Sequence, residues 1–159
     1  MTIALKGLID EDFVNYKKPS MTLMFPYCTF KCGKDICQNS ELAEIPYPLN
    51  VPVDLIYERY NHNPITKAIV LQGLEPLDSW DDVKELLHYV RLVVGCLDDI
   101  VIYTGYTEDE ISEKIKEIET LYSNIIFKFG RYIPNQQPHY DPVLGVNLAS
   151  DNQYAKYIS

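Results

Sequence analysis

The chain has 159 residues, of which 47% are hydrophobic and 23% are charged, a composition typical of a soluble globular protein. Its net charge of -9 argues against binding to a nucleic-acid backbone, because an acidic protein has few cations with which to neutralise phosphates. No apolar run approaches the length of a membrane span, so we expect a cytoplasmic protein that forms one domain over residues 1–159.

Five segments are predicted to be strands. Most of them are short, apolar and rich in β-branched residues, which is typical of strands buried on both faces of a parallel sheet. In chain order they are Thr22–Tyr27, Lys67–Gln72, Asp99–Thr104, Ile125–Phe129 and Val143–Asn147.

The segments between these strands are predicted to contain helices. Residues Pro52–His62 form the first, and Ser79 begins a second whose apolar residues recur at helical spacing. Thr107 and Glu110 have the spacing of a capping box, which predicts the start of a third helix. The segment Ser150–Gln153 has the same spacing and predicts a short terminal helix.

Strands that alternate with helices indicate an α/β fold with a parallel sheet and right-handed crossover helices. Five strands are too few for a closed eight-stranded barrel. We therefore expect a partial, TIM-like barrel, in which ligands bind at the carboxyl ends of the strands. The unusual loops of the chain all follow predicted strands, and so are expected to meet at one rim.

Three cysteines, Cys28, Cys32 and Cys37, lie within ten residues of one another. Iron–sulfur clusters take thiolate ligands, and three of them leave one iron of a [4Fe–4S] cubane open to a substrate. Zinc is the alternative, and it would need a fourth ligand. The candidates for that fourth ligand are Cys96, His62, His88 and His139.

The motifs resemble the radical S-adenosylmethionine (radical SAM) superfamily, and more narrowly the activating proteins of anaerobic ribonucleotide reductase. The resemblance covers essentially the whole chain. It rests on the cysteine trio followed by Gln38-Asn39, on Gln72-Gly-Leu-Glu-Pro76, Ile100-Val-Ile-Tyr-Thr-Gly-Tyr106, Gly130-Arg-Tyr132 and Ala149-Ser-Asp-Asn-Gln153. Two departures are present. The second cysteine gap has four residues where the superfamily usually has two, and Leu74 replaces the second glycine of a Gly-Gly-Glu-Pro loop.

The resemblance implies that Cys28, Cys32 and Cys37 hold a [4Fe–4S] cluster whose open iron chelates SAM. It implies further that Gly73 and Glu75 contact the methionine amino group and that Thr104 lines the cofactor pocket. The implied activity is that of a radical SAM oxidoreductase, which forms a glycyl radical on a partner enzyme. The implied partners are the catalytic subunit of anaerobic ribonucleotide reductase and a low-potential electron donor.

Two other functions remain open from the sequence. One is a radical SAM enzyme that acts on another substrate, and the other is a non-catalytic iron–sulfur or zinc binding module. The short chain favours the activase, because a protein partner could complete a pocket that so small a domain cannot enclose. The proline-rich segment 133–142, beside the expected rim, is a candidate contact for such a partner.

Overall fold

The computed structural model describes residues 1–28 and 48–159. The strands in these ranges are β1 Thr2–Leu5, β2 Gly7–Asp12, β3 Ser20–Phe25, β4 Leu49–Pro52, β5 Ala68–Gly73, β6 Asp99–Tyr103, β7 Ile125–Phe129, β8 His139–Asp141, β9 Val146–Leu148 and β10 Tyr154–Tyr157. The α-helices there are α2 Val53–His62, α3 Trp80–His88 and α4 Ser112–Leu121. A π-helical turn, Tyr89–Val93, extends α3, and short 3₁₀ turns, Pro76–Ser79 and Asp109–Ile111, precede α3 and α4.

The main sheet has six strands in the order β10-β7-β6-β5-β3-β2. The four central strands are parallel, with Leu23 paired to Leu71 and Ile102 paired to Phe127. The edge strands β2 and β10 are antiparallel to their neighbours. Four of the five predicted strands, those now seen as β3, β5, β6 and β7, are thus found in the centre of this sheet.

The predicted fold class is nevertheless wrong, because the sheet is mixed and does not form a TIM-like barrel with crossover helices. The segment Val143–Asn147 does not join the sheet. It contains the turn of a small antiparallel hairpin and the start of β9, which pairs with β8. Asp141 explains the difference, since its Oδ1 accepts hydrogen bonds from the backbone N–H groups of Val143 and Leu144 and folds the chain back on itself.

The predicted terminal helix is also wrong. Ser150 and Gln153 do bond to each other, with the Ser150 N–H donating to Gln153 Oε1 at 3.2 Å. However, the Asn152 and Gln153 side chains donate to backbone carbonyls of Arg131 and Gly130, and these bonds hold the segment as a turn. The chain then continues as β10, the antiparallel neighbour of β7.

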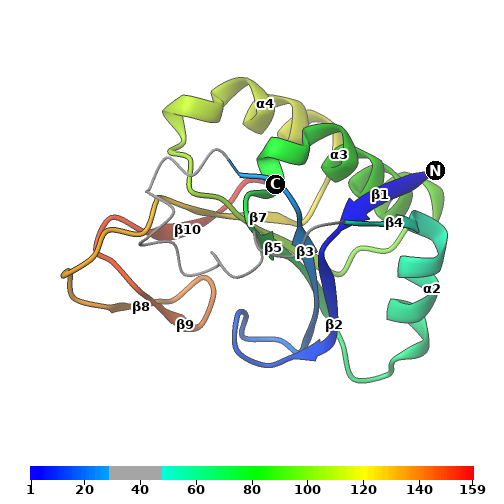
Figure 1. Cartoon of the computed structure of the whole chain (residues 1–159), viewed down its shortest axis with the longest axis horizontal. Coiled ribbons are helices and arrows are strands. Elements are labelled where there is room, and N and C mark those ends of the chain that lie inside the picture. The colour runs from blue at the N-terminus through cyan, green and yellow to red at the C-terminus, as the bar shows by residue number, and fades with distance from the viewer. Residues whose placement is uncertain (29–47) are drawn as a thin grey trace.

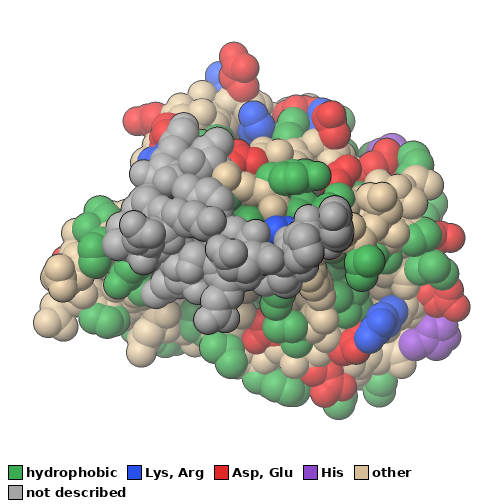
Figure 2. All heavy atoms as spheres, viewed as in Figure 1, with side chains coloured by type: hydrophobic (Ala, Val, Ile, Leu, Met, Phe, Trp, Pro, Cys, Tyr) green, Lys and Arg blue, Asp and Glu red, His purple; other side chains and the backbone are tan. Residues whose placement is uncertain are grey.

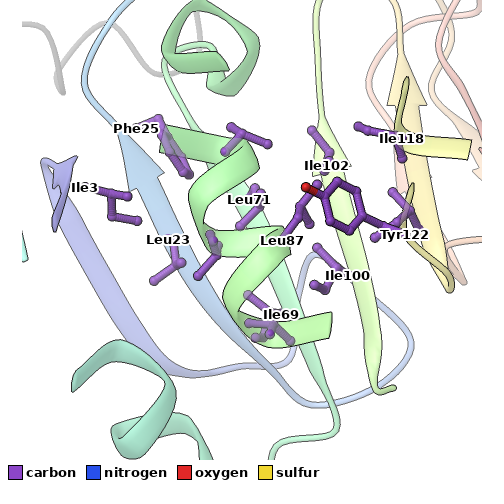
Figure 3. Close-up of a cluster of buried hydrophobic side chains, with 14 of the residues drawn as sticks. Ile3, Leu23, Phe25, Ile69, Leu71, Leu87, Ile100, Ile102, Ile118 and Tyr122 are labelled. Atoms are coloured by element: carbon purple, nitrogen blue, oxygen red, sulfur yellow. The ribbon is translucent and has the colours of Figure 1, made fainter. Parts of the chain in front are cut away.

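The helices form as expected where an apolar stripe meets the sheet. Figure 1 shows α3 and α4 together on one side of the main sheet, and α2 next to the small β1–β4 sheet. Side chains of these helices and of the central strands form the larger of the two buried apolar clusters found among the described residues. Figure 3 shows Leu23, Leu71 and Ile102 of the strands in this cluster, with Leu87 of α3 among them. Each such side chain stabilises the fold by about 1.5–3 kcal/mol.

On the opposite face of the sheet, the covering segments among the described residues are the β2–β3 loop and the β8–β9 hairpin. Tyr16 from the β2–β3 loop and Leu144 and Leu148 from the hairpin pack there against the central strands. The two covering segments meet where the Lys17 N–H donates to the Leu144 carbonyl at 2.7 Å. A pocket opens farther along the strands, at their carboxyl ends.

Arg91 ties together the loops at the amino ends of β6 and β7. Its guanidinium donates to the carbonyl oxygens of Cys96, Asp98, Ser123 and Asn124 at 2.6–3.1 Å, and the residue is only 6% exposed. One side chain thereby donates to the backbone carbonyls of four residues, of which Asn124 also accepts from the Ile100 N–H at 3.1 Å.

Replacing Arg91 by methionine is expected to lower the free energy of unfolding by about 2–4 kcal/mol, because the buried carbonyls lose their donors. Urea unfolding monitored by circular dichroism would measure this. Arg59→Met is the matched control, since it removes an exposed pair with Asp10 and should cost far less. Equal losses in the two variants would contradict the role assigned to Arg91.

Candidate functional site

A pocket of about 380 Å³ opens at the carboxyl ends of the central strands. Its described lining comes from the loops after β5, β6 and β7, from the end of the β3 segment, from the β2–β3 loop and from β9 with the turn that follows it. The residues that the predicted motifs contribute to this lining are Cys28, Gln72, Gly73, Leu74, Glu75, Tyr103, Thr104, Gly105, Tyr106, Gly130, Arg131, Tyr132, Ala149 and Gln153. These residues come from five motifs that are distant in the sequence, and among them are the four loops after predicted strands that were expected to meet at one rim.

Cys28 is the described member of the cysteine trio and lines the pocket just after β3. Cys32 and Cys37 lie outside the described residues, so their position relative to Cys28 stays a prediction. Within the described ranges, no group of three or more His, Cys, Asp and Glu side chains comes together in a way that could hold a metal ion.

The backbone leading to Cys28 is fixed by the loop after β5. The Leu74 N–H donates to the Phe25 carbonyl at 3.1 Å, and the Glu75 N–H donates to the Tyr27 carbonyl at 2.8 Å. Gly73, with φ of 101°, makes the turn that brings these amides into place. The predicted cluster loop and the predicted cofactor loop are therefore hydrogen bonded to each other where they begin.

Glu75 is buried and links the loops after β5 and β6. Its Oε1 accepts from the Gly105 N–H at 2.7 Å and from the Thr104 hydroxyl at 3.0 Å, while its Oε2 accepts from the Leu77 N–H at 3.1 Å. Burial raises the pKa of Glu75 to about 7, and these three hydrogen bonds oppose that rise. The predicted contacts of Gly73, Glu75 and Thr104 with a bound amino acid stay predictions, but all three residues line the pocket.

The raised pKa of Glu75 predicts how stability depends on pH. Between the ordinary value of 4.5 and about 7, the folded protein keeps a proton that the unfolded chain has lost, so stability falls as pH rises. From about pH 5 to about pH 8, the free energy of unfolding of the unmodified protein should fall by on the order of 1–3 kcal/mol more than that of the Glu75→Gln variant. Urea unfolding of both proteins across this pH range measures the difference. A flat difference would mean that the hydrogen bonds keep the carboxylate ionised throughout.

A second network borders the pocket on the side of β6 and β7. Arg131 forms a two-pronged ion pair with Glu110, with both N···O distances 2.9 Å, and its guanidinium lies 5.5 Å from the centre of the Tyr106 ring. The Tyr106 hydroxyl donates to Asp78 at 2.6 Å. The bond from Arg131 lowers the pKa of Glu110 to about 2. The Thr107–Glu110 capping box is present at the 3₁₀ turn Asp109–Ile111 that precedes α4, so Glu110 bonds both to this turn and to Arg131 at the pocket.

The inner wall of the pocket contains residues that sequence reasoning missed. Asn15, on the β2–β3 loop, accepts from Gln72 through Oδ1 at 3.2 Å and from the Tyr103 hydroxyl through its carbonyl at 2.5 Å. Lys128 is buried and donates to the Gly130 carbonyl at 3.0 Å. The sequence offered a signal for Lys128, because a lysine within an otherwise apolar strand suggests a special role for its side chain. No local pattern marks Asn15.

Two further predicted features fall in this region. Leu74, the departure from the Gly-Gly-Glu-Pro pattern, lines the pocket itself. The proline-rich segment 133–142 contributes Pro138 to the lining, and Gln136 accepts from the Asp151 N–H at 2.8 Å. Its predicted contact with a partner protein stays a prediction.

The comparisons with known proteins bear on the cysteine trio. The family model described as a 4Fe-4S single cluster domain matches residues 19–148, a range that includes all three cysteines of the trio. The chain belongs to this family. No curated protein and no solved structure matches the chain.

As a 4Fe-4S single cluster domain, the chain is expected to bind iron and sulfide rather than zinc. The donor set fits the group, because three thiolates in one short segment are the soft ligands that such clusters take.

Among the described residues, no helix has the length and apolar character that a membrane crossing requires. Figure 2 shows Asp and Glu side chains dispersed over the described part of one face, in keeping with the acidic composition.

Proposed function

We propose that the chain is a radical SAM activase, which uses a [4Fe–4S] cluster and SAM to generate a glycyl radical on a partner enzyme. The partner proposed is anaerobic ribonucleoside-triphosphate reductase. One observation carries the proposal: the motifs of the resemblance, dispersed from Cys28 to Gln153, line a single pocket at the carboxyl ends of parallel strands. In α/β sheets this edge is where ligands bind.

In this proposal Cys28, Cys32 and Cys37 hold the cluster, while Gly73, Glu75 and Thr104 form the part of the pocket that receives the amino acid end of SAM. When bound, the cluster would supply the electron that cleaves the sulfonium, and the deoxyadenosyl radical so released would take a hydrogen atom from a glycine of the partner. The cofactors therefore supply the chemistry, and the protein supplies binding and orientation.

The hydrogen bonds between the pocket loops are consistent with a protein that binds and orients its cofactors. The bonds from Leu74 and Glu75 to the Phe25–Tyr27 segment hold the start of the cysteine loop against the SAM-binding loop. The Glu75 carboxylate holds the Thr104 hydroxyl and the Gly105 N–H of the loop after the neighbouring strand β6. Because these loops are held by the protein itself, ligands entering the pocket would meet a preorganised wall.

Oxygen-free reconstitution with iron and sulfide tests the proposal. We expect a cluster whose electron paramagnetic resonance spectrum changes when SAM is added, and release of 5′-deoxyadenosine upon reduction. Addition of the reductase should then produce a glycyl radical doublet. Zinc as the sole bound metal would overturn the proposal. A cluster that releases no 5′-deoxyadenosine would identify a binding module, and release without the doublet would indicate another substrate.

A further inference from the structure

The strand β9 borders the pocket and has one backbone edge without a strand partner among the described residues. Val146, Asn147 and Leu148 all line the cavity, and β9 has β8 as its one strand partner. Adjacent residues of a strand direct their N–H and C=O groups to opposite sides, so the side of β9 away from β8 carries donors and acceptors. Within the described residues, no hydrogen bond from another segment reaches that side.

The edge strands β1, β2, β4 and β10 are protected. Charged residues on β2 and β10, a proline on β4 and a side-chain acceptor for β1 make them poor templates for another strand. These features are Asp10 and Glu11 on β2, Lys156 on β10, Pro52 on β4, and Asp82, which accepts from the Ala4 N–H of β1. The sequence Val146-Asn147-Leu148 contains no charge and no proline, so its edge is left open beside the pocket.

A pair of side-chain amides lies in the same cavity. Asn15 is held at several points: its Nδ2 and N–H donate to Asp12, and its carbonyl accepts from Tyr103. Asn15 in turn orients Gln72 by accepting from Gln72 Nε2, and no described residue donates to Gln72 Oε1. A carboxamide with a fixed orientation has the same donor and acceptor pattern as a peptide group.

The charged groups at the pocket are engaged within the protein. Arg131 is paired with Glu110, Lys128 donates to the Gly130 carbonyl, and Glu75 accepts from Leu77, Thr104 and Gly105. The polar groups along the wall formed by β9, Asn15 and Gln72 are therefore neutral amides. Such a wall matches an uncharged main chain better than it matches a phosphate or a carboxylate.

We propose that the open edge of β9 and the Asn15–Gln72 amide pair together bind an extended main-chain segment of the partner protein, the segment that carries the target glycine. The inference rests on the proposed function and names how its protein substrate is recognised. Recognition through the main chain suits a glycine, because that residue has no side chain to be read and its Cα can lie close to the wall. β9 is only three residues long, so the amide pair is needed to extend the contact.

The test uses the reconstituted protein with SAM and overlapping synthetic peptides from the anaerobic reductase of the same source. A binding peptide is identified by fluorescence anisotropy, and each of its backbone amides is then N-methylated in turn. We expect affinity to fall by about tenfold or more at every second position across the contact, since only alternate amides face the strand edge. Gln72→Leu should weaken the unmodified peptide by a similar factor, and Lys156→Gln on the β10 edge should not.

Hydrogen exchange supplies the second readout. Amides of residues 146–149 should exchange more slowly with the peptide, or with the whole reductase, whereas those of β10 should be unchanged. No protection of β9 by either ligand, or N-methylation without an alternating pattern, would overturn this inference. If 5′-deoxyadenosine and the glycyl radical still form in that case, the proposed function stands. If neither forms, the proposed function has failed as well.

Discussion

Serine at any one of Cys28, Cys32 and Cys37 is expected to reduce bound iron and sulfide to background after oxygen-free reconstitution. A serine oxygen is a harder ligand than a thiolate and loses its proton far less readily, and a cubane held by three protein ligands has no spare one. Iron and labile sulfide analysis, together with visible absorbance, would measure the loss. Release of 5′-deoxyadenosine should fall with it.

Cys96→Ser is the matched control for the cysteine variants. Cys96 lies before β6 at the amino end of the sheet, where its carbonyl accepts from Arg91, and it does not line the pocket. Its replacement should leave the iron content unchanged. A trio variant that keeps its full iron content, or a Cys96 variant that loses it, would contradict the proposed ligand set.

Replacing Gly73 by alanine is expected to lower the free energy of unfolding by about 3–5 kcal/mol. An added Cβ would lie 2.4 Å from the Phe25 nitrogen and 2.8 Å from the Met24 carbonyl carbon, both backbone atoms of the paired strand β3. The backbone cannot retreat without breaking the ladder, and φ of 101° adds conformational strain. Urea unfolding would measure the loss.

Gly95→Ala separates the cost of the close contact with β3 from the cost of the positive φ. Gly95 also has a positive φ, 70°, but an added Cβ would meet nothing within 4 Å. Its replacement should therefore cost only the left-handed backbone conformation, about 1–2 kcal/mol. Equal effects at the two glycines would show that strain alone, and not the approach of β3, determines the cost at Gly73.

The central strands and the main helices were predictable because their signals are local. Each of β3, β5, β6 and β7 is an apolar run that would be unfavourable anywhere but inside a sheet, and the stripe on α3 has the helical period. The small β1–β4 sheet and β2 were missed. β2 contains three acidic residues and lies at an edge, where one side of the strand needs no apolar residues.

The errors at the carboxyl end share one cause. Val143–Asn147 looks like a buried strand and Ser150–Gln153 looks like a helix start, since both satisfy local rules. In the folded protein Asp141 turns the first into a hairpin, and its Oδ2 also accepts from the Ala155 N–H of β10. The second is held as a turn by bonds to Gly130 and Arg131, which are about twenty residues away in the chain. Neither partner is visible in a window of local sequence.

The sequence by itself determined the cysteine trio, the four central strands and the loops that follow them, because ligand chemistry and hydrophobic periodicity are carried by neighbouring residues. Only the tertiary structure decided that the sheet is mixed, that a hairpin and a loop cover its second face, and that Asn15 meets Gln72 and Tyr103 in the pocket. These outcomes depend on hydrogen bonds between residues far apart in the chain, whose formation is governed by the packing of the whole domain rather than by local pattern.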